Sequence, residues 1–421
     1  MDNPSQGRQT RAMTWDTDIL IAGGGLNGPA LALALAQGGF RVTVVDARPA
    51  PDRAEAGFDG RAYALAIASV RLLKAIGLWD SVADKAQPML EIKASDGRAG
   101  EGSAPFFLHF DAAEIEEGPM GHMLEDRFLY AAFLRAMQQT PAITLLSGET
   151  VVAQDVAPSG VTVTLGSGRR LTGGLLVGCD GRGSGTAERA GIRRVGWGYG
   201  QTALVTAIRH EHDHQGTAHQ FFMPSGPLAI LPLKGGHHSS IVWSETDANA
   251  AAIQALPDAE YLDALRPRFG DFLGEIHLAG ARFTYPLSLS LAERFIAHRL
   301  ALVGDAAHGV HPIAGQGLNL GLRDVAALAE VLVLAHRRGE EPGSPAALEE
   351  YQRWRRFDAT ALALGMDTVN RVFSTDNPIL RMGRDLGMGL VSAVPGLRRG
   401  FMRQAAGLTG ELPKLLTGRQ I

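Results

Sequence analysis

Hydrophobic residues near the start of the chain change their spacing in a regular order. Residues 18–22 form a short aliphatic run that ends in glycines, which predicts a buried strand. Residues 29–37 are rich in Ala and Leu and contain no β-branched residue, a composition typical of a helix. Valines return in residues 41–46, as expected of a second strand. Strand, glycine turn, helix and strand make a βαβ unit, so this part of the chain predicts a parallel sheet.

Further along, the patterns predict a mixture of helices and strands. Helices are expected at residues 61–78, 127–139, 248–272 and 318–338. Strands are expected at residues 161–165, 175–177, 228–233, 240–243 and 300–303. The chain after residue 338 reads as mostly helical, with breaks at Pro378 and Pro395.

Composition narrows the class of protein. The 421 residues are 45% hydrophobic, enough for a sizeable core, and the 52 glycines exceed the usual share of about 7%. A net charge of −4 gives no reason to expect nucleic acid as a partner. Cys179 is the only cysteine, which excludes an internal disulfide and a multi-cysteine metal site and fits a reducing, cytoplasmic compartment.

Neither residues 1–16 nor the apolar runs of the sequence predict a signal peptide or a membrane-spanning helix. Residues 1–16 are expected to be a disordered polar tail without the apolar core of a signal peptide. No uninterrupted apolar run reaches the roughly 18 residues that a bilayer span needs. The protein is therefore expected to be soluble or attached to a membrane surface.

The first candidate site lies in the predicted βαβ unit. Gly23, Gly25 and Gly28 form G-x-G-x-x-G between the first strand and the helix. This motif allows a tight turn and lets backbone approach a pyrophosphate at the helix N-terminus. Asp46 follows at the end of the second strand, where an acid binds ribose hydroxyls. The alternative is an ordinary βα turn with Asp46 as a helix cap, and the motif alone does not separate NAD from FAD.

A second candidate site follows the predicted strand at 300–303. Gly304 and Asp305 stand at the strand end, where the carboxylate can bond a ribityl or ribose hydroxyl. A glycine-rich turn then opens the long helix and offers several backbone N–H groups as a cradle. The cradle comprises Gly315, Gln316, Gly317, Leu318 and Asn319, and Pro312, just before it, is a further candidate for cofactor binding. Such a cradle suits the pyrimidine edge of a flavin, which gains negative charge on reduction.

Two stretches resemble motifs of a known family. Residues 300–321 resemble the GD motif of the aromatic-ring flavoprotein hydroxylases, the family of p-hydroxybenzoate hydroxylase. Residues 179–184, with Asp180 and Gly181, resemble that family's DG motif, which is associated with FAD and nicotinamide use. Ala187 departs from the family, which often has a basic residue there, so a nicotinamide contact at this point is in doubt. The resemblance implies that FAD is the cofactor and that Asp180 contributes to its binding. The alternative for Asp180 is an ordinary turn residue without a ligand.

Other stretches are more similar to one branch, the ubiquinone-biosynthesis hydroxylases. Arg61, after Asp59, and Arg127, after Glu125, resemble FAD-facing arginines of this branch; the alternative for both is a surface charge. Residues 231–233 and 241–243 resemble strands of its substrate domain, although Trp243 is more often a packed sheet residue than a substrate contact. Three further stretches resemble its C-terminal tail, namely residues 370–373, 384–387 and 405–407.

The fold that follows is α/β, a Rossmann-like FAD-binding domain with an inserted β-sheet substrate domain and a helical C-terminal region. The FAD-binding domain is expected to be discontinuous, over residues 17–86, 123–187 and 292–345. The substrate domain is expected over residues 87–122 and 188–291, and the C-terminal helical region over 346–421.

The resemblance also implies a reaction. NAD(P)H is the transient reductant of FAD, and dioxygen then gives a flavin hydroperoxide that hydroxylates the aromatic ring of a polyprenylated phenol in ubiquinone biosynthesis. The alternatives are a hydroxylase of a small soluble phenol and a redox-silent, FAD-bound scaffold in a biosynthetic complex. No side-chain acid or base is identified and no metal is expected; His308 is interpreted as structural, its ring satisfied by backbone, and His311 as structural too.

Residues 379–403 combine apolar bulk with cations. Arg381, Arg384, Arg398, Arg399 and Arg403 are interleaved with apolar side chains, against one acid, Asp385. This is the composition of a segment lying on anionic lipid at the inner face of the membrane, where a prenylated substrate would be met. The alternative is a helical pair packed on the protein, with its arginines solvated or facing other ubiquinone-biosynthesis proteins.

Overall fold

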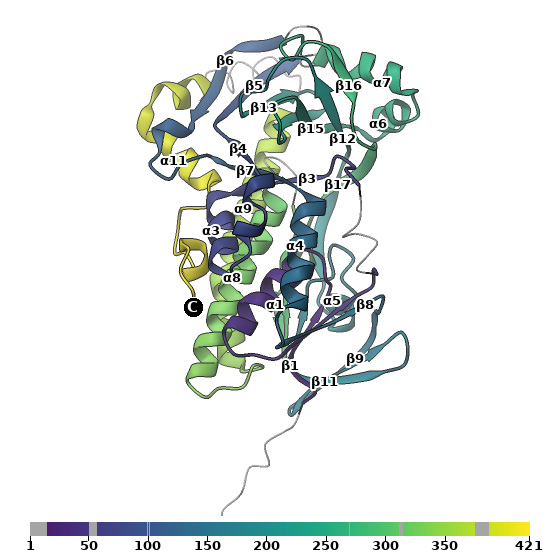
Figure 1. Ribbon diagram of the computed structural model, residues 1–421, viewed down its shortest axis with the longest axis vertical. Helices are drawn as coiled ribbons and strands as arrows, with labels where there is room; N and C mark the ends of the chain where they lie inside the picture. The colour runs from purple at the N-terminus through teal and green to yellow at the C-terminus, as the bar shows by residue number, and fades with distance from the viewer. Residues whose placement is uncertain are drawn as a thin grey trace, which may run out of the picture.

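The computed structural model describes residues 15–49, 57–98, 100, 102–268, 270–310, 315–374 and 387–421. It has a nucleotide-binding half and a half built on a large sheet, and two long helices run along the molecule beside them (Figure 1). Two predictions fall partly outside the described residues. These are the first part of the membrane segment, residues 379–386, and the cofactor-binding candidate Pro312.

The predicted βαβ unit is present. Strand β1 (Thr17–Ala22) leads into helix α1 (Asn27–Gln37), which returns to strand β2 (Val42–Asp46). These strands are part of a sheet with the order β18-β19-β11-β1-β2-β8. Its other members are β8 (Ile143–Ser147), β11 (Arg170–Gly178), β18 (Ile296–Ala297) and β19 (Leu300–Leu302). β1 pairs in parallel with β2 and β11, so the prediction of a parallel sheet is confirmed.

A hairpin extends this sheet and holds the first described residues. Strands β9 (Val151–Ala157) and β10 (Gly160–Leu165) are antiparallel, and β10 pairs with β11. The indole of Trp15 donates to the Ser159 carbonyl, and the Asp16 carboxylate accepts from Thr172. These two residues therefore belong with the sheet, although the sequence analysis included them in the tail.

A small sheet joins the two halves and corrects one prediction. Residues 61–78 were expected to be helical, but 62–66 form strand β3, and helix α3 covers only Ile67–Ala75. β3 pairs with β7 (Gly121–Glu125), which also pairs with β4 (Gln87–Met89). The helical preference of the alanines in β3 is overridden by pairing with a strand that lies far along the chain.

The large sheet has the order β20-β17-β12-β15-β14-β13-β5-β6, with β16 beside β12. Its strands are β5 (Glu91–Arg98), β6 (Gly102–Asp111), β12 (Arg194–His210), β13 (Thr217–Met223), β14 (Gly226–Pro232), β15 (His238–Thr246), β16 (Ile276–Leu278), β17 (Phe283–Ala292) and β20 (His308–Gly309). Helices α6 (Asp247–Gln254) and α7 (Asp258–Leu265) pack on it. Trp243 is buried against Tyr261 of α7, so it is a packing residue.

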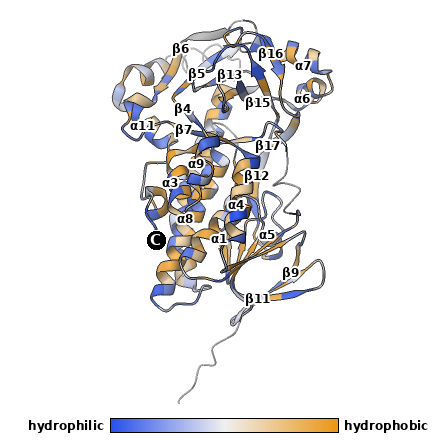
Figure 2. Cartoon of the chain, viewed as in Figure 1, coloured by the Kyte–Doolittle hydropathy of each residue, from blue (hydrophilic) through white to orange (hydrophobic). Residues whose placement is uncertain are grey.

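The remaining helices pack around the three sheets. They are α4 (Asp126–Gln138), α5 (Gly185–Arg189), α8 (Gln316–Arg337), α9 (Pro345–Phe373) and α11 (Pro395–Ala405). Hydrophobic colouring is concentrated on α1, α8 and the strands beside them (Figure 2), which form one core. Across the described residues, we find no helix with the length and apolar character needed to cross a bilayer.

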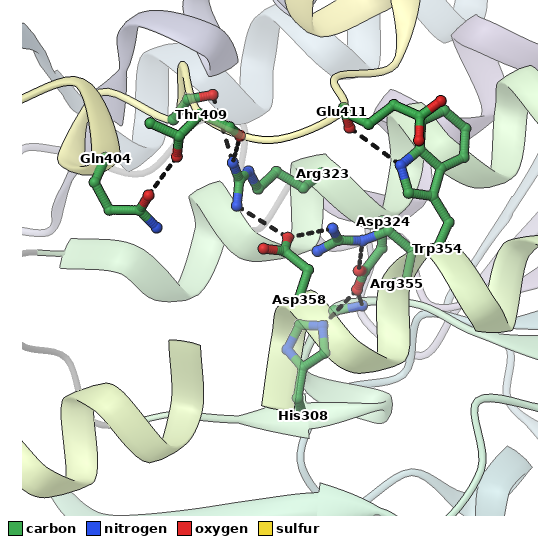
Figure 3. Close-up of polar contacts among 11 residues, drawn as sticks. His308, Arg323, Asp324, Trp354, Arg355, Asp358, Gln404, Thr409 and Glu411 are labelled. Carbon is green, nitrogen blue, oxygen red and sulfur yellow. Dashed lines mark hydrogen bonds and ion pairs between the residues drawn. The ribbon is translucent and has the colours of Figure 1, made fainter. Parts of the chain in front are cut away.

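A chain of buried charges anchors the turn after β19 (Figure 3). The fully buried carboxylate of Asp324, in α8, accepts from the Gly304 backbone N–H at 2.9 Å and lies 2.5 Å from Nε2 of His308. Arg355 of α9 donates to the same carboxylate at 2.8 Å and also pairs with Asp358. His308 is thus structural as expected, but its partner is a carboxylate and not a backbone group.

This network requires Asp324 to be charged. Burial alone would raise the pKa of Asp324, but the adjacent His308 and Arg355 outweigh burial and lower it. Because the pKa is lower in the folded protein, the charged carboxylate stabilises the fold at any pH above 3.8, the ordinary pKa of an aspartate. This stabilisation is lost as the pH falls from 3.8 through the lower pKa of the folded state.

We therefore expect Asp324→Asn to lower the free energy of unfolding by about 3 kcal/mol, because it leaves Arg355 buried beside a neutral partner. Asp358→Asn is the matched control, since Asp358 pairs with Arg355 and Arg323 but its side chain is 37% exposed. Denaturation at neutral pH and below pH 4 measures both variants. Equal losses in the two variants, or the same acid sensitivity in Asp324→Asn as in the wild type, would contradict this account.

Candidate active site

The three glycines of the first motif have different structural roles. A Cβ on Gly23, whose φ is +108°, would lie 2.3 Å from the Cys179 carbonyl oxygen, and a Cβ on Gly28 would lie 2.0 Å from the Gly23 carbonyl oxygen. Both glycines are therefore required by packing of the turn against β11 and α1. A Cβ on Gly25 meets no described atom within 4 Å. Gly25 thus faces open space, where the backbone can approach a ligand.

The N-terminus of α1 is open in the same direction. Within the described residues, no side chain caps this end of the helix, and its first turn contains no acid. The amide oxygen Oδ1 of Asn27 is buried and has no hydrogen-bond partner among the described residues. Uncapped N–H groups at a helix N-terminus attract an anion such as a pyrophosphate, and a hydroxyl of the same ligand could satisfy Asn27.

Asp46 lies beside this turn and is 7% exposed. Its Oδ1 accepts from the backbone N–H of Arg48 at 3.0 Å. A Cβ on Gly24 would lie 2.5 Å from Asp46 Oδ2, so the carboxylate reaches the turn only because residue 24 is a glycine. The sequence analysis missed Gly24 and Arg48, although both stand next to predicted site residues.

The second motif brings Asp305 to the same opening. Gly304 adopts a φ of +64°, and a Cβ there would lie 2.2 Å from Asn27 Nδ2, so the turns after β1 and β19 touch. The Asp305 carboxylate is partly exposed and lies 3.3 Å from Nε of Arg182. Arg194 donates to the backbone oxygens of Asp305 and Ala306 and fixes the turn from the other side.

The glycine-rich cradle begins helix α8. Gly315 is the N-cap residue with a φ of +63°, and no described side chain caps the helix. A Cβ on Gly317 meets no described atom within 4 Å, so the first-turn N–H groups face open space. Pro312 lies outside the described residues.

The side chain of Asn319 turns away from this opening. Its Nδ2 donates to the Ala64 carbonyl at 2.8 Å, while its Oδ1 accepts from Ala66 N–H and from the Ser69 hydroxyl. Asn319 therefore joins α8 to β3 and α3 with its side chain, which is not available to the cradle.

Asp180 is engaged in a similar way. Its carboxylate accepts from the Ser184 hydroxyl at 2.5 Å and from the Thr186 N–H at 2.9 Å. These bonds cap helix α5. The neighbouring Gly181 and Arg182 line the cavity described below, so the turn of this motif borders the opening with its backbone.

The two predicted arginines lie at the junction with the large sheet. Arg61 lines the cavity, and its guanidinium pairs with Asp59 at 2.7 Å and lies 5.5 Å from the centre of the Phe283 ring. Arg127 pairs with Glu125 at 2.6 Å and lies over the rings of Phe58 and Phe128. Arg127 is not among the residues that line the cavity.

These elements enclose a cavity of about 480 Å³. Its lining includes Gly25, Arg48 and Asp305, and also Gly315, Gly317 and Leu318 at the start of α8. The large sheet contributes another part of the lining, with mostly small and aliphatic side chains together with Gln220, Ser240 and Tyr285. Cys179 also lines the cavity, and burial raises the pKa of its thiol, so it stays protonated and is not a nucleophile.

An extended dinucleotide fits this arrangement. The open Gly25, two uncapped helix N-termini, Asp305 and Asn27 with its unsatisfied oxygen all border the same space. Asp46 lies against the adjoining turn at Gly24. The apolar side chains of the large sheet line the same cavity as the start of α8, so a ring system bound at α8 would face them. These features fit FAD, with its pyrophosphate at α1 and its flavin at α8.

Two substitutions test this assignment. We expect Gly25→Val to abolish FAD retention, because it places a branched side chain where the backbone must meet phosphate. Asp305→Ala should weaken retention by the roughly 1.5–3 kcal/mol of one charged hydrogen bond. Flavin absorbance after gel filtration measures both.

Gly396→Val is the matched control, because a Cβ at Gly396 also meets no described atom within 4 Å and Gly396 does not line this cavity. Normal FAD affinity in Gly25→Val would show that the turn is not the pyrophosphate site.

Comparison with known proteins agrees with this geometry. Residues 16–364 match the family described as FAD binding domain. The chain is 46% identical over 404 residues to the ubiquinone hydroxylase UbiL of Rhodospirillum rubrum, covering 95% of this chain and 92% of that one. It is 36% identical over 396 residues to the 3-demethoxyubiquinol 3-hydroxylase of Escherichia coli, covering 93% and 99% of the two chains.

The fold is also that of a solved flavoenzyme. The crystal structure of p-nitrophenol 4-monooxygenase PnpA from Pseudomonas putida superposes with a TM-score of 0.78 at 20% identity, over 94% of this chain and 98% of that one. The chain is an FAD-dependent aromatic-ring monooxygenase that takes its electrons from NAD(P)H. It belongs to the ubiquinone-biosynthesis hydroxylases, within the family of p-hydroxybenzoate hydroxylase.

Proposed function

We propose that this enzyme hydroxylates the aromatic ring of a polyprenylated phenol in ubiquinone biosynthesis, with dioxygen and NAD(P)H as co-substrates. The observation that carries the proposal is the single cavity that runs from Gly25 to an apolar wall of the large sheet. The names of the two relatives, a ubiquinone hydroxylase and a 3-demethoxyubiquinol 3-hydroxylase, support this class of substrate.

In this proposal most cofactor contacts are those expected from the sequence. Gly23, Gly25, Gly28 and Asp46 hold the nucleotide, and Gly304 and Asp305 hold the sugar-alcohol chain. Arg61 and Gly181 border the flavin, as do Pro312 and the cradle from Gly315 to Asn319. Arg127 and Asp180 do not line the cavity, so they act on the cofactor only through their neighbours. The division into FAD-binding, substrate and C-terminal regions is proposed with the boundaries given above.

When bound, FAD supplies the redox chemistry that activates dioxygen, and the chain supplies orientation and electrostatics. The uncapped N-terminus of α8 at Gly315 stabilises negative charge on the reduced ring system. The aliphatic wall, with Val205, Leu231 and Leu287, excludes water from the reacting ring.

Few polar groups can orient the substrate. On the sheet side of the cavity these are Gln220, Ser240 and Tyr285. Gln220 donates its Nε2 to the Leu228 carbonyl at 3.2 Å, which leaves its amide oxygen as the acceptor for a phenolic hydroxyl. This group positions the ring and is not required to move a proton.

Substrate-stimulated turnover tests the proposal. We expect purified, FAD-loaded protein to oxidise NAD(P)H faster in the presence of a prenylated phenol, and to form one hydroxylated product per dioxygen consumed. Mass spectrometry and an oxygen electrode measure this. Equal stimulation by small unprenylated phenols would favour the soluble-phenol alternative, and no stimulation by any phenol would favour a redox-silent scaffold.

We also propose peripheral contact with the inner face of the cytoplasmic membrane through α11 and the residues before it. Leu390, Leu397 and Phe401 are about half exposed there, which gives the segment an apolar face toward solvent. Two of its arginines already have partners: Arg398 pairs with Glu114 and Arg403 with Glu117. Among the arginines of the segment that the structure describes, contact with anionic lipid would therefore depend on Arg399, together with the apolar side chains.

Liposome flotation distinguishes this contact from protein assembly. We expect binding to anionic vesicles, and weaker binding when Arg398, Arg399 and Arg403 are changed to Ser. A variant with Arg169, Arg170 and Arg193 changed to Ser is the control, because these exposed residues lie outside the segment and the loss of charge is the same. Binding that is absent, or equal in the two variants, would favour a surface for other ubiquinone-biosynthesis proteins.

A further inference from the structure

A second cavity, of about 460 Å³, lies among α3, α8, α9 and α11. Its lining is mostly apolar, including Leu320 of α8, Leu362 and Met366 of α9 and Phe401 of α11. Nothing in the reaction described above uses this space. Its volume is within the range of roughly 300–1,000 Å³ that small-molecule sites occupy.

Four of the polar side chains that line it are already paired with one another. The Ser69 hydroxyl donates to Asn319 Oδ1 at 2.7 Å, and Arg323 pairs with Asp358 at 3.0 Å. Groups with partners gain little from a polar ligand, whereas apolar walls gain from any hydrocarbon that removes them from water. The chemistry of this cavity therefore selects an apolar ligand.

A thin wall separates this cavity from the first one. Gly317 and Leu318 of α8 line the first cavity, while the next residues, Asn319 and Leu320, line the second. On β3, Ala64 faces the first cavity and Ala66 the second. One strand and one helical turn thus form a shared wall, and the two cavities lie within reach of a single extended molecule.

The outer rim of the second cavity is apolar as well. Phe401, which lines it, is 55% exposed, and Leu397, one turn earlier on α11, is 47% exposed. An apolar ligand that leaves the cavity would continue along these side chains toward solvent or lipid.

We propose that this second cavity binds the isoprenoid tail of the substrate, which passes the edge of the shared wall while the ring lies in the first cavity. The inference rests on the proposed function for the identity of the ring. It adds a separate site for the tail, made by α9 and α11, that determines preference for prenylated over unprenylated phenols.

Gly365 of α9 provides the means to fill the cavity. Gly365 lines it, and a Cβ there meets no described atom within 4 Å. Gly365→Leu therefore adds a side chain at the cavity lining with no clash at Cβ, and leucine favours a helix more than glycine does. Gly400→Leu on α11 is the matched control, because its Cβ also meets no described atom within 4 Å and it does not line the cavity.

The first measurement is binding of farnesol, an isoprenoid without a ring, by titration calorimetry to the FAD-loaded protein. The second is KM for 2-farnesylphenol and for 2-methylphenol. We expect Gly365→Leu to weaken farnesol binding and to raise KM for 2-farnesylphenol about tenfold, the effect of losing a methylene-sized contact in an apolar pocket. KM for 2-methylphenol should stay unchanged, and Gly400→Leu should match the wild type in every measurement.

Unaltered farnesol binding and KM in Gly365→Leu would overturn the proposal. So would weaker farnesol binding with an unchanged KM for 2-farnesylphenol, because the cavity would then hold a free lipid. Farnesol binding needs no turnover, so failure of the proposed reaction, seen as no oxidation of any phenol, is distinguished from failure of the tail site.

Discussion

The buried carboxylate of Asp324 is the contact on which the geometry of the cofactor site depends. It holds the Gly304 N–H, and so the turn that presents Asp305, and it is itself held by His308 and Arg355. A buried acid is tolerated only with such partners, since its desolvation would otherwise cost several kcal/mol. The position of α9, which carries Arg355, is thereby linked to the cofactor turn, although α9 itself does not line the cofactor cavity.

Asn319, one turn earlier on the same helix, makes the corresponding link on the other side. By bonding Ala64, Ala66 and Ser69 it fixes β3, the strand that follows Arg61 and lines both cavities. Helix α8 therefore has two roles. Its N-terminal N–H groups face the cofactor cavity, and its polar side chains hold the walls of that cavity in place.

Much of the nucleotide-binding region could be predicted because its determinants are local. The turn from Gly23 to Gly28 and the acid at Asp46 are encoded within thirty residues, and the structure brings them to one opening. Strand β3 could not be predicted, because its partner β7 lies about sixty residues away. The partners of Asn319 lie about 250 residues away, and no local pattern specifies them. Asp324 did leave a signal, an acid inside an otherwise apolar helical run, which indicates a buried ion pair.

The charged side chains around the first cavity explain why backbone N–H groups are needed to bind the pyrophosphate of the cofactor. Arg61 is paired with Asp59, and Arg182 lies against Asp305, so these cations are already partly neutralised. Asp180, in the stretch that resembles the DG motif, is engaged in capping α5 and does not line the cavity. A pyrophosphate would therefore be met by N–H groups at Gly25 and at the start of α1, whose first turn contains no acid, together with Arg48 in the cavity lining. Backbone donors have fixed positions, so the cofactor would be oriented by the turn itself, and a side chain at residue 25 would occupy the space that the pyrophosphate needs.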